Sequence, residues 1–283
     1  MLVTGKEILQ HAHKNNYAVG AFNISNLEIA KAVLDAASEC KAPVILQTSE
    51  SAIKYAGFQE LSAIVKVLAD KTPVPVALHL DHGTTYETII GCIRNGWTSV
   101  MIDGSHHPLE ENIAVTSEII KVARAVGVSV EAELGRLSGV EDNISVSEKD
   151  AFYTDPQEAV TFVKETDVDS LAISIGTAHG QYKGIPKLDL DRLQEIKKLV
   201  NIPIVLHGAS GVPEDQIREA TKLGVNKINI DTDIRVAFSD ALKEVFQNKP
   251  EEYDPRKLLT ASMANMKKVV MSKIEMFGSC NKA

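Results

Sequence analysis

The hydrophobic positions of this chain form short, nearly continuous apolar runs, separated by longer stretches with helical spacing. Several runs, such as PVILQ, SVMID and PIVLHG, lack the polar alternation of a half-exposed strand. Parallel strands covered by helices on both faces have this pattern. The eight strands that we expect are Tyr17–Asn23, Val44–Ser49, Val74–Asp81, Ser99–Gly104, Val128–Leu134, Ser170–Thr177, Ile202–Gly208 and Lys227–Asp231.

The segments between these runs have apolar residues at helical spacing, most clearly in Leu27–Cys40 and Glu110–Val126. Alternating strands and helices predict right-handed crossovers and a parallel sheet. Eight such units in about 230 residues fit a closed barrel, so the α/β class and a (β/α)₈ TIM barrel are predicted for 1–283 as one domain. An open doubly wound sheet is the alternative, but it usually has a GxGxxG turn after its first strand, where this chain reads AFNISN.

Two segments interrupt the barrel pattern, and a third follows it. Gly135–Tyr153 and Gln181–Leu188 are long enough for rim loops, which often bind ligands or act as lids. Pro250–Ala283 comes after the eighth unit and predicts one or two extra helices. Asp254 and Pro255 stand near the expected start of the last long one. The barrel should therefore have a C-terminal helical extension.

Composition narrows the class of protein. With 44% hydrophobic and 24% charged residues, the 283-residue chain has the balance of a soluble globular protein. The net charge is −8 and basic residues are scattered, which argues against nucleic acid or an anionic membrane as partner. The three cysteines lie far apart, and we find neither a signal peptide nor an apolar run of membrane-spanning length. We expect a cytoplasmic location.

Histidines gather where the expected strands end, which is where barrels place their active sites. His82, His179 and His207 follow three different strands, and each is directly followed by glycine. Three imidazoles with one open position form a frequent catalytic zinc site. Ordinary polar rim residues would explain any one of them, but three matching positions favour a divalent metal, zinc above all.

Carboxylates at neighbouring strand ends leave two interpretations open. Asp81 stands directly before His82, where it could transfer protons to a metal-bound substrate or orient a histidine ligand. We favour proton transfer. Asp103 and Glu133 could be further oxygen ligands or structural caps, and spacing does not decide between the two.

Small residues after the last two strands predict a phosphate site. The loop Gly208–Gly211 and the segment Asn229–Asp233, which opens a helix over Ile234–Val245, offer free backbone N–H groups. Loops after strands 7 and 8, with a helix N-terminus, often hold phosphate in barrels. We expect the N–H groups and Ser210 to face phosphate, and Asp231 to face substrate hydroxyls.

Six motifs in order, with YAVGAFN before and DPRKLL after them, resemble the class II metal-dependent aldolases over essentially the whole chain: LDHG, MIDGSHHP, VEAELG, GTAHG, LHGASG and NIDTD. Length and the short connection between strands 6 and 7 resemble the class IIb branch. That family includes fructose- and tagatose-1,6-bisphosphate enzymes. GASG also occurs in the tagatose branch, whereas NIDTD is more similar to the fructose branch, so we favour fructose.

The resemblance implies reversible cleavage of fructose 1,6-bisphosphate to dihydroxyacetone phosphate and glyceraldehyde 3-phosphate through a zinc-stabilised enediolate, in glycolysis and gluconeogenesis. It implies a zinc site of His82, His179 and His207, with Asp103 and Glu133 at a second or displaced divalent position. A monovalent cation is left open. A homodimer or homotetramer is also implied.

The same resemblance gives roles to individual residues. Asp81 would donate a proton to the aldehyde-derived oxygen, and Glu141 would move the proton at the ketose-phosphate carbon. Arg256 would reach the far phosphate across a subunit contact, and Ser49 would meet glyceraldehyde 3-phosphate. The implied substrate-binding residues are Asn23, Ser49, Gly180, Gly208, Ala209, Ser210, Asn229, Ile230, Asp231, Thr232 and Arg256.

One other mechanism and two other functions are alternatives to the zinc aldolase. A lysine Schiff base could replace the metal, but Lys183, Lys187 and Lys227 do not stand at strand ends. A metal-dependent hydrolase or isomerase could use the same barrel, because a fold does not fix a function. A sugar-phosphate sensor or a non-catalytic partner subunit of another aldolase is the third alternative.

Overall fold

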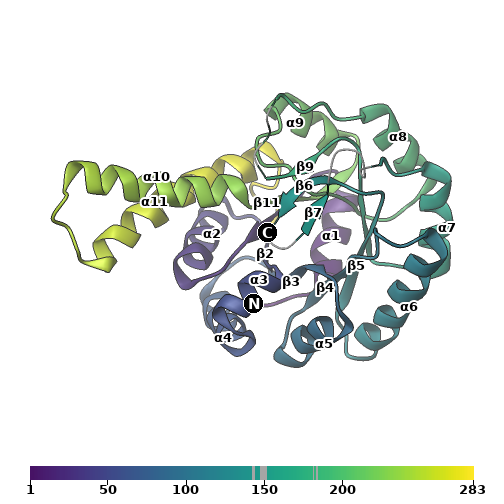
Figure 1. Cartoon of the computed structure of the whole chain (residues 1–283), viewed down its shortest axis with the longest axis horizontal. Coiled ribbons are helices and arrows are strands. Elements are labelled where there is room, and N and C mark those ends of the chain that lie inside the picture. The colour runs from purple at the N-terminus through teal and green to yellow at the C-terminus, as the bar shows by residue number, and fades with distance from the viewer. Residues whose placement is uncertain (142–143, 147–151, 181, 183) are drawn as a thin grey trace.

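A closed barrel of eight parallel strands forms the centre of the molecule (Figure 1). The computed structural model describes the chain except for residues 142–143, 147–151, 181 and 183. Neighbours around the barrel follow the order β1-β11-β10-β8-β5-β4-β3-β2. The strands are β1 Val19–Asn23, β2 Val44–Thr48, β3 Val76–Gly83, β4 Ser99–Ile102, β5 Ser129–Leu134, β8 Ser170–Ile173, β10 Ile204–Leu206 and β11 Val225–Ile230.

Helices surround the barrel and cover the outer faces of its strands, so every residue of these strands is buried (Figure 1). Side-chain caps fix several helix starts: Asn26 accepts from the Ile29 N–H, and Thr85 from the Thr88 N–H. The surrounding helices are α2 Leu27–Cys40, α3 Glu50–Ala56, α4 Phe58–Lys71, α5 Tyr86–Asn95, α6 Leu109–Ala125, α7 Pro156–Thr166, α8 Leu190–Leu199 and α9 Glu214–Lys222.

The main hydrophobic core lies between strands and helices, and a smaller cluster fills the N-terminal end of the barrel. Helix α1 (Gly5–Lys14) contributes Ile8, Leu9 and Ala12 to this smaller cluster. Because α1 closes the N-terminal end, the opposite end, where strands finish, is left for ligands. A three-stranded sheet of β6 (Ser138–Glu141), β7 (Ile144–Val146) and β9 (Ala178–His179) accompanies the barrel.

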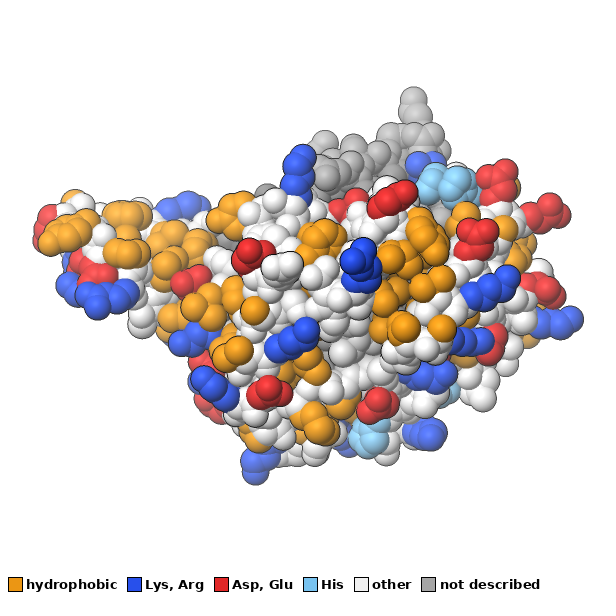
Figure 2. Space-filling view, turned by 90° about the horizontal axis from the view of Figure 1, so that it is seen from below, with side chains coloured by type: hydrophobic (Ala, Val, Ile, Leu, Met, Phe, Trp, Pro, Cys, Tyr) orange, Lys and Arg blue, Asp and Glu red, His pale blue; other side chains and the backbone are white. Residues whose placement is uncertain are grey.

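The last two helices form an arm that projects to one side of the barrel (Figure 1). Helix α10 (Thr232–Asn248) leads outward and α11 (Pro255–Met276) returns, packing against α10 and α2. Asp254 caps α11 by accepting the Arg256 N–H. Figure 2 shows hydrophobic side chains gathered along this arm.

The predicted fold class is confirmed, and closure of the sheet excludes the open doubly wound alternative. All eight expected strands form, with ends shifted by a few residues. The extension contains α11, which starts after Asp254 as expected, whereas α1, α3 and the three-stranded sheet were not predicted. That 1–283 is one domain stays a prediction. In the described part of the chain, every helix is too short or too polar for a membrane span.

Candidate active site

Three buried histidines meet inside the C-terminal end of the barrel. His82 comes from β3, His179 from β9, and His207 directly follows β10. The ring centroids of His82 and His207 are 4.6 Å apart, and those of His82 and His179 are 5.0 Å apart. One ring nitrogen from each histidine lies within 4.8 Å of the others, so the three can bind a single metal ion. The expected clustering of these histidines is therefore observed.

A backbone irregularity brings Asp81 and His82 to the same place. Neighbouring strand residues normally face opposite sides. Here the register between β3 and β4 shifts between Leu80 and Gly83, and His82 has a φ of 48° in the left-handed region. Such a bulge redirects a side chain and often occurs next to active sites. The glycine after His82 is required because a Cβ there would lie 2.4 Å from the Met101 carbonyl oxygen.

Asp103 and Glu133 complete a second group of possible metal ligands around His82. The His82 Nδ1 donates to Asp103 Oδ2 at 2.9 Å. Glu133 Oε2 lies 3.8 Å from His82 Nδ1 and 3.7 Å from His207 Nδ1, and it has no hydrogen-bond partner although it is buried. A buried carboxylate oxygen without a partner is costly, and a cation would compensate for it.

The charges of this cluster are strongly coupled. Burial and the nearby Asp103 raise the pKa of Glu133 well above its usual value. Burial alone would lower the pKa of His82, but Asp103, Asp81 and Glu133 outweigh it and raise that pKa well above the usual value. A divalent cation bound among these groups would favour their deprotonated forms, so metal binding at this place would be linked to proton release.

Asp81 is held by side-chain amides on both carboxylate oxygens. Asn23 and Gln47 each donate to Asp81 Oδ2 at 2.9 Å, and Asn229 donates to Oδ1 at 3.0 Å. Gln47 also donates to Asn23 Oδ1 at 2.7 Å. The carboxylate is thus fixed beside His82. Sequence reasoning missed Gln47, although a glutamine directly after the apolar residues of PVILQ is the signal that could have found it.

The expected phosphate loops line a cavity of about 730 Å³ at the start of α10. Gly180, Ser210 and Thr232 contribute to its wall, and Ser210 Oγ accepts the Asp233 N–H at 3.3 Å. Gly208, with a φ of 62°, passes so close to Ala178 that a Cβ would lie 2.5 Å from the Ala178 carbonyl oxygen. Ala209 and Asn229 are buried beside these loops, as is Ile230, the last residue of β11.

Two charged residues near this cavity have partners that the sequence did not predict. Asp231, expected to face substrate hydroxyls, forms an ion pair with Arg235 at 2.7 Å. Lys273 of α11 lines the cavity and contacts Asp233 Oδ2 at 2.6 Å. Sequence reasoning missed Lys273, because nothing in the pattern of α11 indicates that the C-terminal end of this helix reaches the barrel.

The sequence matches the family described as fructose-bisphosphate aldolase class-II over residues 3–282. The chain belongs to the class II fructose-bisphosphate aldolase family. This membership makes it an aldolase, a lyase that acts on carbon–carbon bonds, as the motifs had predicted.

Relatives of this aldolase are similar over their full length. A protein named fructose-bisphosphate aldolase from Helicobacter pylori is 48% identical, and the match covers 100% of both chains. A protein of the same name from Geobacillus stearothermophilus is 47% identical, and the match covers 100% of this chain and 99% of that relative. The crystal structure of the YdjI aldolase from Escherichia coli K12 has a TM-score of 0.89 at 36% identity, covering 100% of both chains. Fructose-bisphosphate aldolase from Campylobacter jejuni has a TM-score of 0.85 at 27% identity, covering 100% of this chain and 97% of that one.

Three further site residues that the sequence predicted lie on different elements of the aldolase. Ser49 is buried at the end of β2, where its hydroxyl caps α3 by accepting the Ala52 N–H. Glu141 ends β6, which pairs with β9 through Gly139 and His179, but its side chain lies outside the described part. Arg256 lies on the arm, exposed and 2.9 Å from Asp254.

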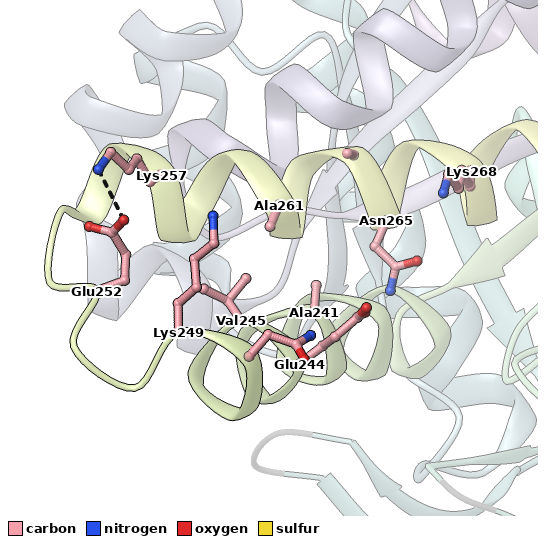
Figure 3. Close-up of a pocket in the computed structure, with 11 residues that line it drawn as sticks. Ala241, Glu244, Val245, Lys249, Glu252, Lys257, Ala261, Asn265 and Lys268 are labelled. Atoms are coloured by element: carbon pink, nitrogen blue, oxygen red, sulfur yellow. Dashed lines mark hydrogen bonds and ion pairs between the residues drawn. The ribbon is translucent and has the colours of Figure 1, made fainter.

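A further cavity, of about 380 Å³, lies between the two helices of the arm (Figure 3). Lys249, Lys257 and Lys268 point into or border it together with Glu244 and Glu252. The histidine cluster contributes nothing to its wall, so this cavity belongs to the arm and not to the active centre.

Proposed function

We propose that this aldolase cleaves fructose 1,6-bisphosphate into dihydroxyacetone phosphate and glyceraldehyde 3-phosphate and catalyses the reverse condensation. One observation carries this proposal. Three buried histidines meet beside Asp81, which side-chain amides hold in place, and next to them lies a cavity lined by the loops predicted to bind phosphate. Relatives named fructose-bisphosphate aldolase at 47–48% identity support this sugar over its tagatose epimer.

Zinc is the metal that we propose for His82, His179 and His207. Imidazole nitrogens with nearby carboxylates suit zinc, and the unpartnered oxygen of Glu133 favours a cation at this place. A bound zinc ion would supply Lewis acidity that polarises the carbonyl of the substrate. Asp103 and Glu133, with His82, would provide a second or displaced divalent position. A monovalent cation stays a prediction.

The proton chemistry falls to carboxylates of the chain. Asp81 removes the proton of the C4 hydroxyl during cleavage and returns it to the aldehyde-derived oxygen during condensation. Asn23, Gln47 and Asn229 fix its direction while leaving it next to His82. Glu141 moves the proton at the ketose-phosphate carbon. In support, it stands two residues after Gly139, the β6 residue that pairs with His179 of β9.

Substrate binding follows from the loops around the cavity. Gly180, Gly208 to Ser210 and Asn229 to Thr232 hold dihydroxyacetone phosphate, largely through backbone N–H groups at the start of α10. Ser49 meets glyceraldehyde 3-phosphate. A lysine Schiff base at Lys227 is disfavoured because this lysine is fully buried and ion-paired to Glu131.

The direct test is a cleavage assay on the purified chain with fructose 1,6-bisphosphate and tagatose 1,6-bisphosphate. Each sugar is tested as purified, after chelation and after zinc is added back. We expect triose phosphate from fructose 1,6-bisphosphate at the higher rate, lost on chelation and restored by zinc. A faster reaction with the tagatose sugar would make the chain a tagatose-bisphosphate aldolase.

Absence of triose phosphate from both sugars, with folded and zinc-loaded protein, contradicts the aldolase proposal. It would favour a hydrolase or isomerase, or a sugar-phosphate sensor. Activity that appears only when a second chain is added would identify a non-catalytic partner subunit.

We propose that the aldolase is a homodimer or homotetramer in which Arg256 serves a neighbouring active site. Arg256 lies on the projecting arm, and Phe246 and Tyr253 of this arm are exposed by 47% and 89%. Hydrophobic side chains also gather along the surface of this arm, and a contiguous apolar surface of this kind supports an interface between proteins (Figure 2). A cytoplasmic location is also proposed, since all three cysteines are free thiols.

The Arg256→Ala variant should lose about 10- to 100-fold in kcat/KM, because a hydrogen bond to a charged group contributes about 1.5–3 kcal/mol. Arg124→Ala is the matched control, because it removes an exposed arginine of α6 that pairs with Asp167. Mixing Arg256→Ala chains with Asp81→Asn chains should restore activity, because one chain lends its arginine to the other. A monomer in light scattering, or no restoration after mixing, contradicts the shared site.

A further inference from the structure

A row of buried polar side chains lies one layer deeper in the barrel than the candidate metal ligands. Lys227 of β11 is 0% exposed, and Glu131 of β5 and His79 of β3 are each 1% exposed. Lys227 Nζ lies 3.0 Å and 2.9 Å from the two oxygens of Glu131 and 3.4 Å from His79 Nε2. His79 Nδ1 in turn shares a hydrogen bond of 2.8 Å with Ser99 Oγ on β4.

Such a row is unusual at this depth. The interior layers of a (β/α)₈ barrel are filled mainly by branched apolar side chains. Lysine and glutamate are almost never fully buried unless they are paired, and a buried ion pair often adds little net stability compared with apolar residues. Stability therefore does not explain why Glu131 and Lys227 occupy the centre of the barrel.

The row ends on a candidate zinc ligand. His207 Nε2 donates to Glu131 Oε1 at 2.8 Å, while its Nδ1 lies 2.8 Å from His82 Nε2 within the histidine cluster. Because a carboxylate only accepts, this bond places the ring hydrogen of His207 on Nε2. The lone pair of Nδ1 then points toward the other two histidines.

We infer that Glu131 and Lys227 form a positioning pair for His207, an inference that rests on the proposed zinc centre. Glu131 selects the tautomer and the orientation that make Nδ1 the metal donor, and it increases the basicity of the ring. Lys227 holds both oxygens of Glu131 in place and balances its charge. Among the described residues, neither group of possible metal ligands contains Glu131. Asp103 differs from Glu131, because it accepts a hydrogen bond from His82 and also belongs to one of these groups.

The test uses the full-length chain with Glu131→Gln and with the double substitution Glu131→Gln/Lys227→Met. The double variant removes both charges, so no unpaired charge stays buried if the single variant folds poorly. Zinc affinity is measured by competition with a chromophoric chelator, and the His207 tautomer in metal-free protein by long-range ¹H–¹⁵N correlation. Lys6→Met/Asp169→Asn removes another lysine–carboxylate pair, with an N–O distance of 2.8 Å, and is the matched control.

We expect zinc affinity to fall about 10- to 100-fold in the double variant, as for other substitutions next to metal ligands. The His207 signal should be the Nε2–H form in the wild type and a mixture of tautomers in the variant, with the control unchanged in both measurements. If the wild type binds zinc and the folded double variant binds it equally well, the inference is wrong and the zinc centre stands. If the wild type binds no zinc, the proposed centre itself fails.

Discussion

Replacing His207 with alanine should lower carbon–carbon cleavage by more than ~10³-fold, because Lewis-acid stabilisation of several kcal/mol would be lost. His207 is fully buried in the histidine cluster, and water can replace its nitrogen only with loss of geometry and affinity. The measurement combines metal content of the purified variant with its rate on fructose 1,6-bisphosphate. The wild type treated with chelator should show the same loss and, unlike the variant, recover when zinc is added.

The matched control is His107→Ala. This histidine also follows a barrel strand, but it is partly exposed and pairs with Glu111 at 3.2 Å on α6. We expect His107→Ala to retain metal and activity. A His207→Ala variant that keeps both would contradict the assignment of His207 as a ligand.

The second large effect is expected for Asp81→Asn. General acid–base groups typically contribute about 10²- to 10⁴-fold, so kcat should fall in that range while bound zinc is retained. The amide has nearly the shape of the carboxylate but cannot take up the C4 hydroxyl proton. Because Asn23, Gln47 and Asn229 all donate to Asp81, one contact becomes repulsive, and thermal unfolding should be recorded in parallel.

Asp167→Asn is the control for this substitution. Asp167 is an exposed residue at the end of α7 with a φ of 54°, a conformation that asparagine tolerates. Normal kcat in Asp81→Asn would exclude this carboxylate from proton transfer. Loss of zinc from Asp81→Asn would instead assign it to metal binding.

The sequence predicted the barrel well because the physical signal is strong there. Strands buried on both faces must be apolar throughout, and runs such as PVILQ and PIVLHG could hardly be read otherwise. The histidine–glycine pairs at three strand ends were also informative, and the structure shows the reason for two of them. After His82 and His207, the backbone approaches Met101 and Ala178 too closely for a Cβ.

Other features depend on contacts between distant segments and could not be predicted. The bulge that turns His82 inward is visible only in the pairing of β3 with β4. His179 was expected just past a barrel strand, but it belongs to β9, whose partner β6 lies far away in sequence. From the sequence, Lys227 was considered only as a Schiff-base lysine, and it was set aside because it stands at the start of its expected strand and not at the end. Its pairing with Glu131 requires β11 and β5 to face each other across the barrel.

The order of strands places His82 and His207 on opposite sides of the barrel. In the ring β1-β11-β10-β8-β5-β4-β3-β2, β3 and β10 are diametrically opposed, four places apart in either direction. A metal ion bound by His82 and His207, as proposed, would therefore link two opposite strands of the barrel. If the chain were split between α6 and β5, the first half-barrel would hold His82 and Asp103, and the second Glu133, His179 and His207. Metal capture by both together would then report that two half-barrels had reassembled.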